Sequence, residues 1–154
     1  MYLPSELDYI FKNNISIDIV QIPYNVYDRR FHSYFPLLQQ KNIEVHTRSA
    51  FLQGLVFIES TKLNPHFKKL QEKQQQLHTI AQQNNLSIAS LCLNFCLAQT
   101  GINNVVIGID SLENLEENLM TTSQAEKVRS ILMSLEQLVE TDENIILPYN
   151  WKLQ

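Results

Sequence analysis

Three short apolar segments, separated by stretches with helical periodicity, constrain the fold most: residues 15–22, 43–46 and 105–108. The first is rich in β-branched residues and stops at Pro23, which cannot donate a backbone hydrogen bond inside a sheet. Strands that are apolar at almost every position are typical of parallel sheets. A helix at 33–41 joins the first two strands in a unit of about 30 residues, as in right-handed crossover units. The sequence therefore predicts an α/β fold with about three parallel strands and flanking helices.

Further helices are predicted where apolar residues recur at helical spacing. A short amphipathic helix at 4–14 precedes the first strand, and a long loop at 47–64 follows the second. Pro65 can open the next helix because the first helical position needs no backbone N–H. In chain order, the helices after this loop cover residues 65–84, 88–99, 111–119 and 124–139.

Composition indicates one globular domain over residues 1–154, because 44% hydrophobic content supplies one sizeable core. The net charge of −4 leaves no basic patch for nucleic acid. The N-terminus has no positive region followed by an apolar stretch, and no run of about 18 apolar residues occurs, so neither secretion nor a membrane is predicted. We therefore expect a cytoplasmic protein.

Cys92 and Cys96 lie one helical turn apart on an apolar face and are interpreted as core residues. The four histidines have no zinc-ligand spacing, so no metal site is predicted. The glutamines at 74–76 are interpreted as a solvated helix face. Three strands do not close a sheet, so we expect at least one open edge and part of an open interior face.

Five segments resemble the aldo-keto reductase family and occur in the order of that family. They are IDIVQIPYNVYDRR, VHTRSAFLQGLV, LSIASLCLNFCL, VVIGIDSLENLEENL and ILPYNW. The resemblance implies the C-terminal half of an NAD(P)H-dependent carbonyl reductase, with residues 15–22, 43–46 and 104–108 as the last three strands of a (β/α)8 TIM barrel. Roughly half of a barrel of about 250 residues is then absent. The fold expected is a partial barrel, and the partners expected are a nicotinamide cofactor and, in the complete enzyme, a carbonyl substrate.

In such a barrel the cofactor lies at the carboxyl ends of the strands. The resemblance implies that Gln21 contacts the nicotinamide carboxamide, since an amide can donate and accept at once. It implies that Arg48 stacks on a ring or reaches a phosphate. The alternative interpretations are an ordinary polar strand end and a surface arginine. Tyr24 and Asn25 are assigned to the following loop, with packing as one reading of Tyr24.

Four residues after the second strand resemble the segment that passes the diphosphate: Ser49, Phe51, Gln53 and Gly54. Hydroxyl and backbone N–H groups are suitable donors to a phosphate. The alternative for Gly54 is a simple turn.

After the third strand, Gly108 and Ser111 lead into a helix whose first N–H groups could hold a phosphate. Asp110 would repel that anion, with helix capping as its alternative role. Gly108 and Asn114 offer no positive charge to a 2′-phosphate, so NADP(H) and NAD(H) both stay open.

The resemblance also implies that Glu117 and Asn118 contact the adenine, the alternative being a solvated helix face. The family's catalytic tetrad of Asp, Tyr, Lys and His belongs to strands before the start of this chain. No residue here matches those positions, so the chain alone is expected to be inactive.

Two functions from different classes follow. The chain could be a truncated or split aldo-keto reductase that a complementing N-terminal half completes, or a non-catalytic degenerate barrel that acts as a binding or interaction module. A remnant without function is a third possibility. Because the strands would expose apolar surface, self-association is expected.

Overall fold

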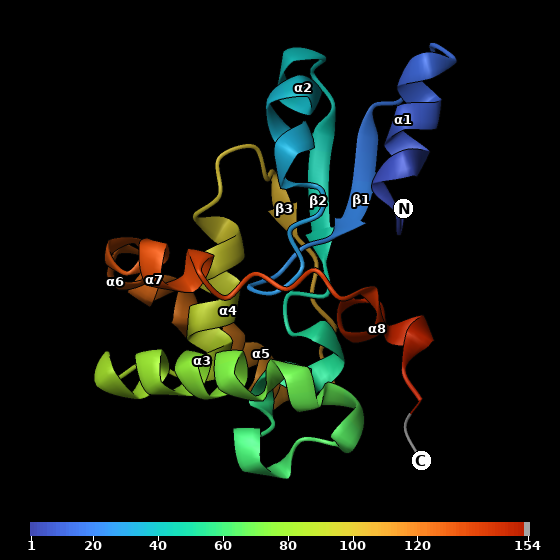
Figure 1. Ribbon diagram of the computed structural model, residues 1–154. Helices are drawn as coiled ribbons and strands as arrows, with labels where there is room; N and C mark the ends of the chain where they lie inside the picture. The colour runs from blue at the N-terminus through green and yellow to red at the C-terminus, as the bar shows by residue number, and fades with distance from the viewer. Residues whose placement is uncertain (153–154) are drawn as a thin grey trace.

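Three parallel strands form the sheet of the computed structural model, which describes residues 1–152. They lie in the order β1 (Ile19–Pro23), β2 (Glu44–Arg48) and β3 (Asn104–Val105), as Figure 1 shows. Helices flank them, so the predicted α/β fold with three parallel strands is confirmed. None of the helices in the described part of the chain is long and apolar enough to cross a membrane.

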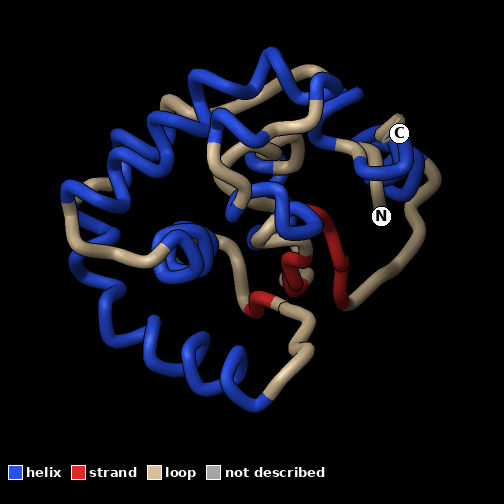
Figure 2. The backbone as a smooth tube through the Cα atoms, turned by 90° about the horizontal axis from the view of Figure 1, so that it is seen from below, coloured by secondary structure: helices blue, strands red, loops and turns tan. Residues whose placement is uncertain are grey.

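The helices form an arc outside the strands when the molecule is seen from below (Figure 2). In chain order they are α1 (Pro4–Lys12), α2 (Phe35–Gln40), α3 (Gln71–Gln83), α4 (Ile88–Leu97), α5 (Leu112–Thr121), α6 (Ala125–Ser130), α7 (Leu132–Glu136) and α8 (Glu143–Ile146). Short 3-10 helices cover His32–Tyr34, Leu52–Phe57, Ser60–Lys62, Pro65–Leu70, Thr122–Gln124 and Pro148–Asn150.

The strand limits differ from those predicted. Pairing with β2 begins only at Ile19, so residues 15–18 lie outside β1 although they are apolar in part. β2 extends through Arg48, because its last residues pair with Ile22 and Pro23. The third strand ends at Val105 rather than at residue 108, since it pairs with β2 over two positions before the chain leaves the sheet.

The boundaries of several helices and loops also differ from those predicted. The loop 47–64 contains two 3-10 helices, and the segment from Pro65 begins as a 3-10 helix before α3. The predicted helix at 124–139 is divided into α6 and α7, because Ile131 has φ −112° and ψ 12°, outside the helical range.

Among residues 1–152, helices cover one face of the sheet and leave the other largely open. Val20, Ile22 and Val45 are buried, whereas Ile19 and Gln21, which alternate with them, are exposed. Side chains alternate between the two faces of a strand, so the exposed Ile19 and Gln21 mark the face that no described helix covers. The expectation of an open interior face is therefore confirmed.

A polar row runs across this open face. The register pairs Gln21 with His46 and His46 with Asn104. Nε2 of His46 lies 2.9 Å from Oε2 of Glu44 and 2.9 Å from Nδ2 of Asn104. The middle of the face is thus hydrogen-bonded and polar rather than apolar.

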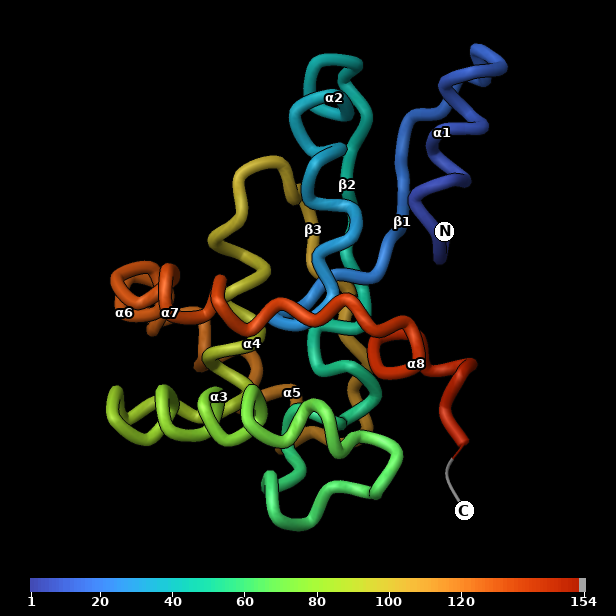
Figure 3. The backbone as a smooth tube through the Cα atoms, in the orientation of Figure 1, coloured from blue at the N-terminus to red at the C-terminus, as the bar shows by residue number. Residues whose placement is uncertain are grey.

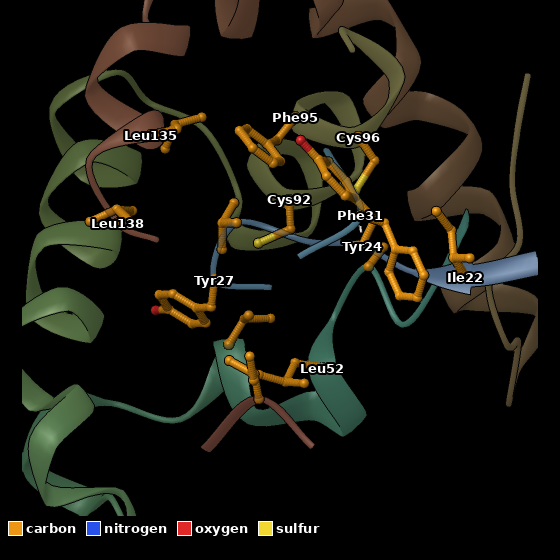
Figure 4. Packing of buried hydrophobic residues seen from close by; sticks show 14 of the residues in the cluster. Ile22, Tyr24, Tyr27, Phe31, Leu52, Cys92, Phe95, Cys96, Leu135 and Leu138 are labelled. Atoms are coloured by element: carbon orange, nitrogen blue, oxygen red, sulfur yellow. Dashed lines mark hydrogen bonds between the residues drawn. The ribbon is translucent and has the colours of Figure 1, made fainter. Parts of the chain in front are cut away.

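The core lies on the covered face, between the strands and α4. The rings of Tyr24 and Phe95 stack with centroids 5.9 Å apart and planes 8° from parallel (Figure 4). Cys92 and Cys96 are fully buried beside them, which confirms their assignment to the core. Burial raises the pKa of the Cys96 thiol to about 12, so this side chain stays neutral and packs as an apolar group.

We predict that the chain self-associates through its uncovered apolar side chains. On α5, Leu112, Leu119 and Met120 are 70%, 63% and 75% exposed. Burying such groups between copies is favourable by about 25 cal/mol per Å². Sedimentation velocity at micromolar concentration should therefore show species larger than a monomer, and Met120→Lys should shift them toward the monomer.

Met133→Lys is the matched control, because Met133 is equally exposed but lies on α7. A monodisperse monomer of the unchanged chain would contradict the prediction.

Candidate functional site

A cleft lies where the strands end. It has a volume of about 650 Å³, and β1 and β2 contribute Gln21 and Arg48 to its wall. Parallel strands bring their carboxyl ends to one edge of the sheet, so the loops that follow them meet there. The other lining residues are Ser49, Ala50, Phe51, Gln53, Gly54, Val106, Ile107, Gly108 and Asp110.

A second cavity of about 480 Å³ continues this cleft toward α5. The two share Phe51, Gly54, Gly108 and Asp110. The second is completed by Phe57, Ala89, Asn114, Glu117 and Asn118. The structure thus brings together every residue that the sequence proposed for the cofactor except Ser111.

Ser111 has a local role in the structure. Its Oγ accepts a hydrogen bond of 3.1 Å from the backbone N of Asn114, which makes Ser111 the N-cap of α5. This bond satisfies one of the unpaired N–H groups in the first turn of the helix.

The cleft wall after β2 has an unusual backbone. Ser49, Leu52, Gln53 and Gly54 have φ values of 63°, 43°, 53° and 82°. This left-handed region is free for glycine and costs other residues energy. The backbone N of Leu52 donates to the Ser49 carbonyl at 2.9 Å, and that of Gly54 donates to the Phe51 carbonyl at 2.9 Å. The segment is thus folded back on itself. Because its conformation costs energy, it needs hydrogen bonds from residues outside the segment.

Asn25 provides one such support. Its Nδ2 donates to the Ser49 carbonyl at 3.1 Å, while its Oδ1 accepts from the backbone N of Tyr27 and of Asp28, both at 2.9 Å. The Asn25 side chain is fully buried. The sequence predicts only a loop position for Asn25, which lies two residues after β1 within a segment that resembles the family.

Arg48 is neither free nor a simple surface residue. Its guanidinium carbon lies 4.3 Å from the centroid of the Tyr2 ring. Nη2 donates to the Met1 carbonyl at 3.2 Å, and Nη1 donates to Ser49 Oγ at 3.3 Å. The positive charge is therefore held at the Gln21 end of the cleft.

The charges of the cleft are unevenly distributed. Among the described residues, Arg48 is the cation that lines the first cavity, Asp110 lines both cavities, and Glu117 lines only the second. No tyrosine, lysine or histidine lines either cavity in the part of the chain that the structure describes. Among residues 1–152, no group of His, Cys, Asp and Glu could hold a metal ion.

Tyr24 is remote from this chemistry. Its hydroxyl lies 2.9 Å from Nδ1 of His32 and donates to Oε1 of Gln99 at 3.3 Å. Burial raises the pKa of the Tyr24 phenol well above its ordinary value. Tyr24 is therefore a core residue, as one reading of the sequence proposed.

The glutamine run on α3 is not wholly solvated, which corrects the sequence interpretation. Gln75 and Gln76 are exposed, but Gln74 is fully buried. Its Oε1 accepts from the Tyr27 hydroxyl at 2.7 Å. The reason is the rotation of the helix by about 100° per residue, which turns one glutamine of three toward the protein.

Three parallel strands with helices outside them and a cleft at their carboxyl ends correspond to part of an α/β barrel. The aldo/keto reductase family model matches residues 4–136, so the chain belongs to the aldo/keto reductase family.

Solved structures share the fold of this chain. Aldo-keto reductase AKR11C1 from Bacillus halodurans, in its apo form, superposes with a TM-score of 0.62 at 20% identity over 92% of this chain and 50% of that one. Its holo form gives a TM-score of 0.61. The thermostable aldo-keto reductase Tm1743 gives 0.57 at 22% identity over 84% of this chain and 43% of that one.

Two curated relatives are the uncharacterized oxidoreductase YqkF of Bacillus subtilis and the L-galactose dehydrogenase of Arabidopsis thaliana. The first is 25% identical over 88% of this chain, and the second is 22% identical over 92% of it. The matches cover 46% of each relative, so the chain spans about half the length of the curated relatives it matches.

We predict that Gly54→Ala destabilises the fold, because any side chain is strained at φ 82°. The free energy of unfolding measured in urea should fall by about 1–2 kcal/mol. Gly108→Ala is the matched control, since its φ lies outside the left-handed region and a Cβ at either glycine meets no atom within 4 Å. Equal losses for the two variants would contradict a left-handed Gly54.

Proposed function

We propose that this chain holds the nicotinamide cofactor of a carbonyl reductase. The observation that supports the proposal is the continuous cleft at the strand ends, which runs from Gln21 past the 49–54 segment to Asn118. Membership of the aldo/keto reductase family supports the same ligand, and one similar structure is described as a holo form. Carbonyl reduction by the complete protein is part of the same proposal.

The residues of the cleft suit the parts of a dinucleotide. The Gln21 side chain is exposed and makes no hydrogen bond among the described residues, so its amide is available to a carboxamide. The Ser49 hydroxyl and the backbone after it can donate to a diphosphate, next to the charge of Arg48. Glu117 and Asn118 can accept from and donate to an adenine.

A bound reduced nicotinamide would supply hydride to the carbonyl carbon of an aldehyde or ketone. The carbonyl oxygen then needs a proton from a general acid. The cleft lining offers no phenol, ammonium or imidazole among residues 1–152. In this proposal the chain binds and orients the cofactor, and the acid comes from a complementing half.

A second candidate function is a non-catalytic interaction module. The lack of a phenol, ammonium or imidazole in the described cleft and the exposed apolar side chains of α5 favour it. Cofactor binding separates the two functions, because an interaction module has no need of it.

The cleft charges bear on which cofactor is bound. Asp110 and Glu117 line the end assigned to the adenosine, and no cation lines that cavity among the described residues. A carboxylate can accept a hydrogen bond from a ribose 2′-hydroxyl but repels a 2′-phosphate. We therefore propose NADH rather than NADPH as the preferred form.

We predict that NADH raises the thermal stability of the purified chain. A ligand at one hundred times its Kd stabilises the native state by about 2.7 kcal/mol. Gln21→Ala should raise the NADH Kd at least fivefold without lowering the melting temperature of the free protein, since the exposed side chain makes no hydrogen bond among the described residues.

Gln75→Ala serves as the control, because Gln75 is an exposed glutamine on α3 outside the cleft. A melt that neither NADH nor NADPH changes would reject cofactor binding and leave the interaction module.

We predict further that the carboxylates discriminate between the two cofactors. Asp110→Asn and Glu117→Gln should each narrow the ratio of the NADPH Kd to the NADH Kd severalfold, measured by nicotinamide fluorescence. High salt should narrow the ratio in the unchanged chain too, because it screens exposed charges. Glu113→Gln is the control on the same helix, outside the cleft. Tighter binding of NADPH by the unchanged chain would reject this preference.

A further inference from the structure

A buried amide lies behind the wall of the cleft. Gln74 projects from α3 toward the chain that follows β2, a segment that descends to this helix in Figure 3. Its Nε2 lies 3.1 Å, 2.9 Å and 2.6 Å from the carbonyl oxygens of Leu55, Val56 and Ile58. One side chain thus reaches three carbonyls of one short segment.

Glutamine suits this position chemically. Its NH2 group donates to carbonyls, and its Oε1 accepts from the buried Tyr27 hydroxyl at 2.7 Å. His78, one turn later on α3, has Nε2 2.9 Å from the Val56 carbonyl, so the tautomer with its proton there donates to the same group. The carbonyls would otherwise lie buried with fewer partners, which proteins avoid.

The segment 55–58, which Gln74 holds in this way, forms part of the cleft wall. Phe57 lies between Val56 and Ile58, whose carbonyls face Gln74, and its ring lines the cavity that also contains Glu117 and Asn118. The centroid of the Phe57 ring is 5.2 Å from that of Phe51, which lines both cavities. Movement of residues 55–58 would therefore move the Phe57 ring and change its packing against Phe51.

We propose that Gln74 is a positioning residue for the α5 end of the cleft. It touches no lining surface itself, since it is fully buried behind the segment 55–58. It acts by fixing the backbone on either side of Phe57, while Asn25 fixes the start of the same loop at Ser49. The role in ligand binding rests on the proposed function, but the role in holding the segment does not.

The test compares Gln74→Leu with Gln75→Leu, which changes an exposed glutamine on the same helix. Hydrogen exchange of the backbone amides at 52–58 should become at least tenfold faster in Gln74→Leu, with β1 and β2 unchanged. The NADH Kd should rise at least fivefold. Tyr27→Phe removes the hydroxyl that orients the amide but leaves its donors, so its effects should be smaller.

Three other results would contradict different parts of the proposal. Unchanged exchange at 52–58, or an equal acceleration throughout the chain, would overturn the positioning role. Local acceleration with an unchanged NADH Kd would overturn the link to the cleft. If the unchanged chain binds no NADH, the proposed function fails, and exchange at 52–58 still decides whether Gln74 holds the segment.

Discussion

The parallel pairing of β1 with β2 is the constraint on which the rest of the structure depends. Its register places Pro23 beside Arg48, so both strands end at the same level. The ladder continues for one more bond, from the backbone N of Tyr24 to the Arg48 carbonyl at 3.1 Å. The segments that follow β1 and β2 then separate. The space between these two loops and the end of β3 is the cleft. A shift of one residue would turn every strand side chain to the opposite face.

The side-chain amides of Asn25 and Gln74, both buried, stabilise the loop that follows β2. The segment from Ser49 to Gly54 has left-handed residues that cost energy in isolation. Asn25 binds one end of the loop, and Gln74 binds the chain that follows it. Both side chains lie where water cannot replace them. A backbone fixed on one side by hydrogen bonds can present its other side to a ligand without further ordering.

The strands and the cleft could be predicted to different degrees from the sequence. Apolar runs located the three strands and the cysteine pair, because burial leaves a local pattern. The residues of the cleft came from the family resemblance, since nothing local connects Gln21 with Asn118. Gln74 could not be recognised, because its acceptors lie 16 to 19 residues earlier and its donor Tyr27 lies 47 residues earlier. The break at Ile131 has no glycine or proline to signal it.

The polar row on the open sheet face affects what can cover that face. Glu44 and His46 are about half and about one quarter exposed, and both would lose water under any covering element. Removing such groups from water costs several kcal/mol unless new hydrogen bonds replace the old ones. An apolar surface would therefore pack unfavourably on this face, whereas a surface with complementary hydrogen-bond donors and acceptors would pack favourably. The face thus selects its neighbour by chemistry and not by hydrophobicity alone.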